Sequence, residues 1–341
     1  LSDDNAAEIK KHIIQNNIYG VDIEKGAVDI ARLRFWLAII VDEKTPHALP
    51  NMDFKIMQGN SLIPTFDGKY VNLSDKLRHV NSSKIRDAKK ELSRLQSSFY
   101  NSEGEEKKEL LVKIKYQILE IVKLQMDYEY RAEVERSAQM FDLFNTEIKR
   151  VVVDDEKAKI VGQCIRLQQQ LQSSAKSLNE KTEIAIPFFD WKIMFSDVFQ
   201  DSINSDPGFD ICIGNPPYIQ LQSNDGLLGK MYADIGFKSF ASTGDIYCLF
   251  YEKGWQLLNR NGKLCYITSN KWMRAGYGSK LRDFFVTYTT PMQLIDFAGV
   301  KIFENATVDT NILLLSREKA EDVQTQAAII PSKDVLSKLS D

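Results

Sequence analysis

The chain has 341 residues and 43% hydrophobic content, enough for a full core in about two globular domains. Its formal net charge of −3 disfavours a uniformly basic nucleic-acid scaffold, so any basic groove must be local. The four cysteines lack C-x-x-C spacing and the three histidines are scattered, so they predict packing residues and no metal site. The absence of a long apolar run and of a signal peptide indicates a cytoplasmic protein without a membrane span.

The stretch from Pro64 to Pro187 differs in composition from the rest of the chain. It is rich in Lys, Glu, Gln and Ser, and apolar residues recur in it at helical spacing. The two periodic series are Leu111, Ile114, Ile118, Val122 and Met126, and Ile160, Cys164, Leu167, Leu171 and Leu178. We therefore expect two or three long antiparallel helices packed as a hairpin or coiled coil. Their mixed charges favour a projecting spacer over an arm that grips DNA or another domain.

The apolar run 209–214 carries the most informative motif of the chain at its end. The run predicts a buried strand of a parallel sheet. The residues that follow it directly are Asn215, Pro216, Pro217 and Tyr218. They therefore lie at the carboxyl end of the strand, where open α/β sheets place their ligand crevices. Two prolines end the strand pairing and hold the backbone carbonyls in one direction.

This tetrapeptide has the groups needed to hold a planar amine. The Asn215 side-chain oxygen and the Pro216 carbonyl are two acceptors for one NH2 group, and Tyr218 offers a ring face for stacking. Acceptors that pull the hydrogens of an exocyclic amine out of the ring plane free its lone pair to attack a methyl group, without a general base. The alternative is that Asn-Pro-Pro-Tyr is only a turn, which the preceding strand makes less attractive.

Basic and aromatic residues alternate in the sequence around this motif. They are Lys230, Lys238, Lys253, Lys271 and Arg274, with Tyr232, Phe237 and Trp272. The pattern suits the binding of a flipped nucleic-acid strand and suits a solvated loop equally well. The sequence leaves both readings open.

The motif and its surroundings resemble a family, the adenine-N6-specific DNA methyltransferases, in particular the type IIG-like restriction-modification polypeptides that fuse a nuclease to the methyltransferase. The resemblance covers residues 9–64 and 187–317. It implies an α/β fold with a Rossmann-like class I methyltransferase sheet, interrupted by the helical insertion. The implied domains are 1–63, the N-terminal part of the methyltransferase; 64–187, the insertion; and 188–341, the C-terminal part.

The resemblance also orders the expected elements. They are a helix at 3–16, the second and third strands at 18–23 and 54–60, a helix that starts within 244–250 and leads through 261–263 into a strand at 264–268, and two last strands at 294–297 and 311–315. The final strand is expected to be antiparallel. The order of the set makes the resemblance more specific than any single piece.

S-adenosylmethionine is the cofactor that the resemblance implies. Asp22 stands where the family has an acidic residue that binds the ribose hydroxyls, and Ile23 would pack on the cofactor adenine. Asn60 and Ser61 end the third strand, where the family contacts the adenine amino group. An acidic residue after a strand is equally often a helix cap or a surface charge.

The target base would be stacked between Tyr218 and Phe303. The family commonly places an aromatic residue at the position of Phe303, on the far side of an extruded base. Seen alone, Phe303 is more typical of a core residue than of a clamp.

The chain departs from the family pattern at its first strand and glycine-rich turn, which are missing. Only glycine lets the backbone approach the methionine part of the cofactor. The other close pair, Gly276 and Gly278, is expected on a surface turn. We therefore expect a fragment that binds S-adenosylmethionine weakly or not at all by itself. An upstream segment and a target-recognition domain of the same polypeptide are its expected partners, the latter supplying DNA sequence specificity.

The leading hypothesis is part of a site-specific methyltransferase that moves a methyl group from S-adenosylmethionine to N6 of a flipped adenine in double-stranded DNA. One alternative is a protein-glutamine N-methyltransferase, which would grip a side-chain amide with the same motif. Another is a noncatalytic DNA- or partner-binding module of a restriction system. Mg²⁺ is expected only if a nuclease domain exists elsewhere in the polypeptide.

Overall fold

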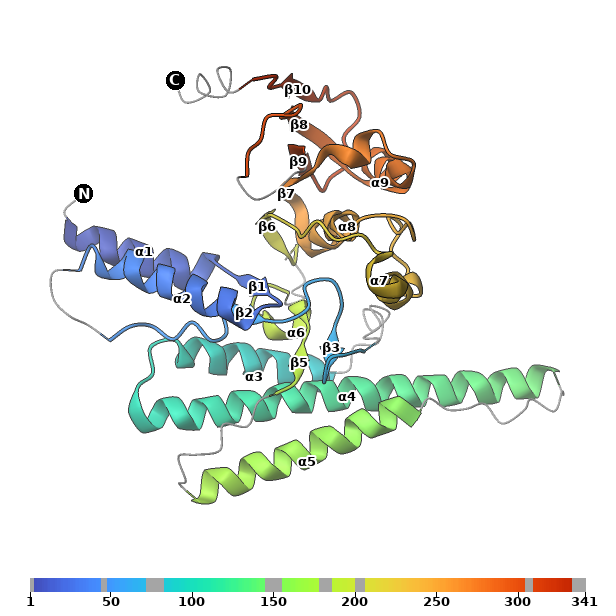
Figure 1. The fold of residues 1–341 in the computed structure, drawn as a ribbon. Helices are drawn as coiled ribbons and strands as arrows, with labels where there is room; N and C mark the ends of the chain where they lie inside the picture. The colour runs from blue at the N-terminus through green and yellow to red at the C-terminus, as the bar shows by residue number, and fades with distance from the viewer. Residues whose placement is uncertain are drawn as a thin grey trace. The chain divides into compact units, whose positions relative to one another are not determined.

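The computed structural model describes residues 3–43, 48–71, 83–144, 155–177, 186–199, 206–303 and 309–332. The chain divides into two compact units, Leu1–Gln200 and Asp201–Asp341, which we call unit 1 and unit 2. Figure 1 shows the order of their helices and strands along the chain.

Unit 1 begins with two helices and a two-stranded parallel sheet. These elements are α1 (Asp3–Asn17), β1 (Gly20–Asp22), α2 (Lys25–Ile40) and β2 (Ile56–Gln58). β1 pairs with β2 so that Asp22 lies opposite Gln58. Ile14, Ile39 and Met52 form a small buried cluster in this region. The helix and both strands expected here are present, although the strands are shorter than expected.

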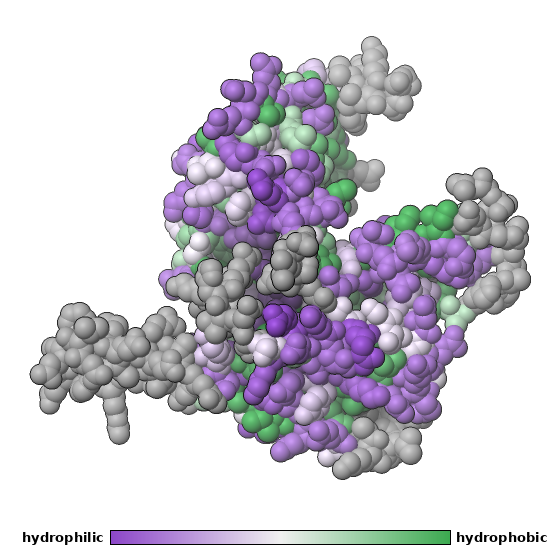
Figure 2. Space-filling model, turned by 180° about the vertical axis from the view of Figure 1, so that it is seen from behind, coloured by the Kyte–Doolittle hydropathy of each residue, from purple (hydrophilic) through white to green (hydrophobic). Residues whose placement is uncertain are grey.

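α2 carries an apolar stripe that the described residues leave uncovered. Ile30, Leu33, Leu37 and Ile40 follow one another at helical spacing, and each is about half exposed. The face of the molecule in Figure 2 is largely hydrophilic, with apolar residues gathered in separate patches. A stripe of this kind is normally a packing face of a helix.

The segment 64–187, expected to be an insertion, has three long helices in its described parts, and these lie side by side (Figure 1). They are α3 (Ser83–Phe99), α4 (Gly104–Phe144) and α5 (Asp155–Ser177). α4 packs against both of the others. Members of the two predicted apolar series are buried, among them Ile114, Ile118, Cys164 and Leu171. The helical periodicity of the sequence is therefore confirmed for these positions; Leu178 lies outside the described residues.

A small antiparallel sheet that the sequence did not predict lies at both ends of the insertion. It consists of β3 (Thr65–Phe66), β4 (Lys69–Tyr70) and β5 (Phe188–Phe189), followed by the short helix α6 (Trp191–Met194). β3 pairs with β4 and with β5. Strands of two residues have no detectable alternation, so only the tertiary pairing reveals them.

Unit 2 is built on a five-stranded sheet with the order β10-β8-β9-β7-β6. The strands are β6 (Phe209–Gly214), β7 (Leu258–Ser269), β8 (Thr290–Asp296), β9 (Thr310–Ser316) and β10 (Gln326–Ile329). β6 is parallel to β7, and β9 is antiparallel to both β7 and β8. The predicted antiparallel strand is thus confirmed. β10 was not expected; it extends the sheet by parallel pairing with β8.

Helices complete unit 2. They are α7 (Ser223–Ala233), α8 (Tyr247–Leu257), α9 (Ser279–Tyr288) and the short 3-10 helices η2 (Asn270–Met273) and η3 (Gly276–Gly278). α8 approaches β7 very closely, because a Cβ on Gly254 would lie 2.4 Å from Leu264. Tyr247 and Tyr251 of α8 are fully buried beside Phe284 and Phe285 of α9. This aromatic cluster is the core of the unit.

The expectation of a buried strand at 209–214 is wrong for two of its side chains. Ile211 and Ile213 are 69% and 79% exposed. β6 is an edge strand of its sheet, and no strand among the described residues pairs with its outer side. An apolar run therefore marks a strand that could be buried, and pairing decides whether it is.

Two other boundaries differ from the sequence expectation. β7 begins at Leu258, so the segment expected to lead into the strand is already part of it. β8 begins at Thr290, four residues before the predicted start at Leu294. No helix in the described ranges is long and apolar enough to cross a membrane.

Candidate functional site

The loop that follows β6 presents the predicted tetrapeptide to solvent. Gly214 pairs with Tyr266 in the parallel β6–β7 ladder, so the loop leaves the sheet at the carboxyl end of both strands. Asn215 and Pro217 are exposed, whereas Pro216 is buried between them. The motif is therefore anchored by one proline and accessible at its asparagine.

The root of this loop rests on a tyrosine ring. A Cβ on Gly214 would lie 3.1 Å from the ring of Tyr266, closer than ordinary van der Waals contact. The Tyr266 hydroxyl also contacts the sulfur of Cys212 at 3.2 Å. Glycine at position 214 thus lets β6 and its loop lie directly over the aromatic core.

Tyr218 is held beside Asn215. Its hydroxyl donates a hydrogen bond of 3.2 Å to Asn215 Oδ1, which occupies one of the two lone pairs of that oxygen. The half-buried ring meets Tyr247 edge-on, with centroids 6.2 Å apart and an interplanar angle of 89°. Burial raises the pKa of Tyr218, so its hydroxyl keeps its proton and remains a donor.

Backbone hydrogen bonds fix the continuation of the loop. Leu221 N donates to Gly244 O at 2.8 Å, and Ile246 N donates to Ile219 O at 2.9 Å. The residue between them, Asp245, forms an antiparallel bridge with Gln220. Backbone pairing therefore joins the segment before α8 to the end of the tetrapeptide loop.

Asp245 and its neighbours form a buried polar group that the sequence analysis missed. Tyr277 Oη donates to Asp245 Oδ2 at 2.8 Å, and the Tyr247 and Tyr277 hydroxyls lie 2.9 Å apart. The sequence reading treated Asp245 only as the start of a helix. A buried acid needs a donor, and a conspicuous tyrosine between two glycines was the available signal.

Polar side chains also line the carboxyl ends of β7 and β8. Asn270 Nδ2 donates to Asp296 Oδ1 at 2.8 Å, and Trp272 Nε1 donates to Asn311 Oδ1 at 3.2 Å. The predicted stacking residue, Phe303, is a half-buried side chain in the segment after β8. The structure records no contact between it and Tyr218.

The basic and aromatic alternation around the motif is largely structural. Tyr232 and Trp272 are buried, and Lys238 Nζ donates to Tyr288 Oη at 2.9 Å. Lys271 and Arg274 are exposed on the loop after β7. The aromatic members therefore serve mainly the fold, and these two cations are the members presented to solvent near the end of β7.

The predicted cofactor residues of unit 1 lie at the carboxyl ends of β1 and β2. Asp22 is exposed, and its Oδ1 accepts a hydrogen bond of 2.8 Å from Glu24 N. Ile23 is 64% exposed, and Gln58 Nε2 donates to its carbonyl at 3.0 Å. An exposed carboxylate beside an exposed apolar side chain is thus present at this edge.

Asn60 and Ser61 follow on the neighbouring strand. Asn60 Oδ1 accepts hydrogen bonds from Leu62 N at 2.9 Å and Ile63 N at 3.3 Å, so its oxygen shapes the turn. The carbonyl of Ser61 accepts from Trp191 Nε1 at 3.0 Å. Asn60 can offer a ligand its amide NH2 more readily than its oxygen.

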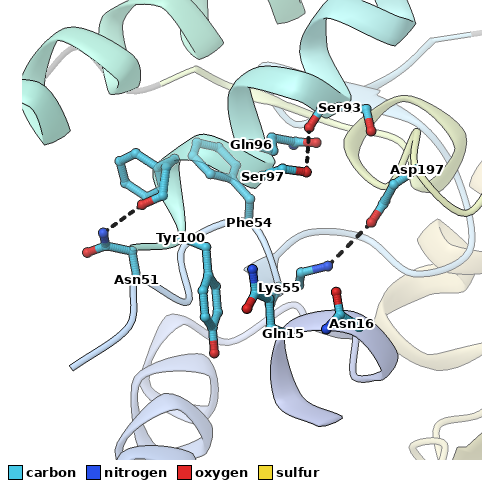
Figure 3. Close-up of a pocket in the computed structure, with 11 residues that line it drawn as sticks. Gln15, Asn16, Asn51, Phe54, Lys55, Ser93, Gln96, Ser97, Tyr100 and Asp197 are labelled. Carbon is cyan, nitrogen blue, oxygen red and sulfur yellow. Dashed lines mark hydrogen bonds and ion pairs between the residues drawn. The ribbon is translucent and has the colours of Figure 1, made fainter. Parts of the chain in front are cut away.

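A cavity of about 60 Å³ lies in unit 1 away from these residues (Figure 3). Lys55 Nζ and Asp197 Oδ2 face each other across it at 3.3 Å, and Tyr19 Oη donates to the same carboxylate at 2.5 Å. Burial lowers the pKa of Lys55, against the opposing effect of Asp197. None of the predicted site residues lines this cavity, whose charged groups satisfy one another. Within the described ranges, no cluster of His, Cys, Asp or Glu has the arrangement of a metal site.

Comparisons with known proteins show which family the chain resembles in sequence. Residues 16–303 match the family described as Eco57I restriction-modification methylase. A type II restriction enzyme and methyltransferase assigned in Methanocaldococcus jannaschii, RM.MjaORFECS2P, is 25% identical over 92% of this chain and 27% of its own length. The Escherichia coli enzyme RM.Eco57I, a type II restriction enzyme and methyltransferase, is 33% identical over 33% of this chain and 12% of its own length.

A solved structure with a partial likeness is that of a Listeria monocytogenes protein assigned to the class I S-adenosylmethionine-dependent methyltransferases. It is 16% identical, with a TM-score of 0.31, over 41% of this chain and 43% of its own. The architecture is that of a mixed α/β protein. Its five-stranded sheet contains both parallel and antiparallel strand pairs. The chain belongs to the Eco57I restriction-modification methylase family. It spans about a quarter of the length of the M. jannaschii relative and less of the E. coli one.

Proposed function

We propose that this chain supplies the base-binding loop and part of the cofactor site of a DNA methyltransferase that modifies N6 of adenine. The observation that carries the proposal is the exposed Asn215, which is anchored by the buried Pro216 and held beside Tyr218 at the carboxyl end of β6. Membership of a restriction-modification methylase family supports the same activity.

The chemistry needs an amine whose lone pair is available. Asn215 Oδ1 has one lone pair engaged by Tyr218 and one left for an N–H of the amine. The Pro216 carbonyl would accept the second N–H. The loop would hold the amine with its lone pair free to take the methyl group that a bound S-adenosylmethionine would supply, and the methylated amine would then release one proton to water. The loop contributes positioning and electrostatic stabilisation.

S-adenosylmethionine, when bound, supplies the electrophilic methyl group. The residues at the end of β1 fit such a ligand, because Asp22 presents an exposed carboxylate for sugar hydroxyls and Ile23 an exposed apolar side chain for a base. Asn60 would add an amide donor. The oxygen of Asn60 is already engaged in its own turn, so its amide NH2 would donate to an acceptor nitrogen of the adenine ring, in place of the predicted contact with the adenine amino group.

The substrate we propose is double-stranded DNA with the target adenine flipped out of the helix. A base inside the duplex cannot reach an exposed loop of this kind, and extrusion exposes both of its faces. Tyr218 would stack on one face and Phe303 on the other. Sequence specificity would come from a target-recognition domain of the same polypeptide, and a segment upstream of this chain would complete the cofactor site.

The helical insertion, residues 64–187, is proposed as a spacer between the two parts of the methyltransferase domain, 1–63 and 188–341. Its helices bury their own apolar faces, and its surface pairs are local, such as Arg94 with Glu91 and Lys108 with Glu105.

A DNA substrate and four cysteines that are free thiols suit the cytoplasm.

The decisive variant is Asn215→Ala in the complete polypeptide. Removing one acceptor should lower methyl transfer by at least about a hundredfold, as losses of single transition-state hydrogen bonds do. Transfer is measured with tritiated cofactor and DNA, and cofactor affinity by calorimetry. The affinity should stay within about twofold, because the proposal assigns Asn215 to the base and not to the cofactor.

Asn261→Ala is the matched control, since Asn261 is an exposed asparagine at the amino end of β7. It should leave methyl transfer unchanged. Retention of activity in Asn215→Ala, or an equal loss in Asn261→Ala, would contradict the role of the loop.

A further inference from the structure

A chain of hydroxyl groups runs behind the proposed base-binding loop. Asp245 is only 7% exposed, and Tyr277 Oη donates to its Oδ2 at 2.8 Å. Tyr247 lies next, with its hydroxyl 2.9 Å from that of Tyr277. Because the single Tyr277 proton points to the carboxylate, Tyr247 must be the donor to Tyr277. Burial raises the pKa of both tyrosines, so each keeps the proton that this chain requires.

This series of hydroxyl groups ends beside the Tyr218 ring, which would stack on the base. Tyr247 meets the Tyr218 ring edge-on at 6.2 Å, and Tyr218 in turn donates to Asn215 Oδ1. The Tyr218 ring is therefore held at its hydroxyl by Asn215 and at its side by Tyr247. A shift of Tyr247 would alter this edge-on contact with Tyr218.

Tyr277 is itself placed by a rigid loop. η3 begins directly after Ala275, and a Cβ on Gly278 would lie 2.0 Å from the carbonyl oxygen of Trp272. Arg282 Nη1 donates to the carbonyls of Trp272 at 2.6 Å and Ala275 at 3.1 Å. Gly278 is buried, so the expectation of a simple surface turn around Gly276 and Gly278 is wrong for Gly278. The loop holds Tyr277 toward Asp245.

A buried carboxylate is a costly way to support a fold, because its charge must be removed from water. Here the carboxylate belongs to the segment whose backbone is paired with the end of the tetrapeptide loop, through Ile219 and Leu221. The same segment thus contacts the loop through its backbone and the stacking ring through Tyr247. Both contacts converge on the residues that would hold the base.

We propose that Tyr277, anchored by Asp245, is a positioning residue that sets the orientation of the Tyr218 ring through Tyr247. The inference rests on the proposed function, because it assigns the ring to the flipped base. Tyr277 touches neither the base nor the cofactor. It acts by keeping Tyr218 and Asn215 in the geometry that stacking and hydrogen bonding to the amine require.

The test is a double-variant cycle in the complete polypeptide, with Tyr277→Phe, Tyr218→Ala and the combination. Tyr277→Phe should lower kcat for methyl transfer about tenfold, as the loss of a hydrogen bond to a charged group does, with the KM for cofactor unchanged. In the Tyr218→Ala background the same substitution should change kcat by less than about twofold, since the ring to be positioned is gone.

Tyr288→Phe is the matched control, because its hydroxyl accepts only an exposed bond from Lys238 in the same unit. It should leave kcat unchanged. Should Tyr277→Phe fail to fold, Tyr247→Phe removes the last hydroxyl and leaves the Asp245–Tyr277 bond intact. That variant should lose about threefold in kcat, with the same dependence on Tyr218.

Two results would overturn the positioning role alone: an unchanged kcat in Tyr277→Phe, or a loss of equal size with and without the Tyr218 side chain. The second result would mean that Tyr277 serves only the stability of the unit. A wild-type polypeptide that transfers no methyl group to DNA would overturn the proposed function and the positioning role together.

Discussion

The loop of unit 2 that we propose to bind the base and the residues of unit 1 that we propose to bind the cofactor have very different structural supports. The loop leaves a five-stranded sheet and is backed by buried tyrosines, by a buried acid and by paired backbone. Asp22 and Ile23 end a strand of three residues in a sheet of only two strands. Two-stranded sheets are marginally stable by themselves.

The two regions differ in how firmly their side chains are preorganised. The groups that would bind the amine are held by contacts within unit 2, among them the Tyr218–Asn215 hydrogen bond and the edge-on contact of Tyr218 with Tyr247. The residues proposed to bind the cofactor are held by local bonds such as Glu24 N to Asp22 Oδ1, and the apolar stripe of α2 is uncovered among the described residues. We therefore expect substitutions behind the loop to act on folding and geometry, and substitutions at β1 to act on affinity alone.

The largest effect should come from the loop that supports Tyr277. Gly278→Ala places a methyl group 2.0 Å from the Trp272 carbonyl oxygen, and a backbone atom cannot move aside easily. We expect a loss of about 2 to 3 kcal/mol in the free energy of unfolding, measured by urea denaturation. Gly276→Ala is the matched control, because nothing lies within 4 Å of its Cβ position, and it should cost less than about 0.5 kcal/mol. Equal losses of stability in the two variants would contradict the tight packing of this loop.

A smaller effect is expected at the cofactor residues. Asp22→Ala in the complete polypeptide should weaken the binding of S-adenosylmethionine about tenfold, because a charged acceptor for the sugar hydroxyls is lost. Calorimetry measures the affinity, and kcat at saturating cofactor should not change. Glu24→Ala, an exposed acid two residues along, controls for the loss of charge. Unaltered affinity in Asp22→Ala would assign Asp22 to capping the turn.

Much of the fold could be predicted from the sequence, because several elements carry local signals. The apolar spacing in 111–126 predicted a helix, which is α4, and the apolar run at 209–214 predicted a strand, which is β6. β3, β4 and β5 could not be predicted, since strands of two residues depend on partners far apart in sequence. The exposure of Ile213 could not be predicted either, because an edge strand and a central strand have the same apolar pattern.

The candidate site shows the same division between local and long-range information. Asn215 and the two prolines after it are consecutive in the sequence, so the chemistry proposed for them could be predicted without a structure. Asp245 and Tyr277 are 32 residues apart, and only the packing of α8 against the loop after β7 brings them together. The role of Asn60 in its own turn could not be predicted either. Only the structure shows that its side-chain oxygen accepts hydrogen bonds from Leu62 N and Ile63 N.

The smallest effect concerns access to the core behind the loop. Burial raises the pKa of the Cys248 thiol to about 12, above the value near 8.5 of an unfolded cysteine. The buried, protonated thiol therefore contributes fully to the free energy of unfolding below about pH 8.5, and this contribution is lost as the pH rises toward 12. At pH 8 a thiol reagent should therefore label Cys248 only at the rate of unfolding, followed by mass spectrometry of its peptide. Labelling as fast as in the denatured chain would show that the support of the loop opens freely.

The central claim is that Asn215 and its neighbours present an adenine amine to a methyl donor. The most direct measurement is mass spectrometry of nucleosides from DNA incubated with the complete polypeptide and S-adenosylmethionine carrying a deuterated methyl group. We predict deuterated N6-methyladenine with the wild type and at least about a hundredfold less of it with Asn215→Ala. Label in a glutamine side chain of protein, in another nucleoside, or in adenine irrespective of Asn215 would contradict the account.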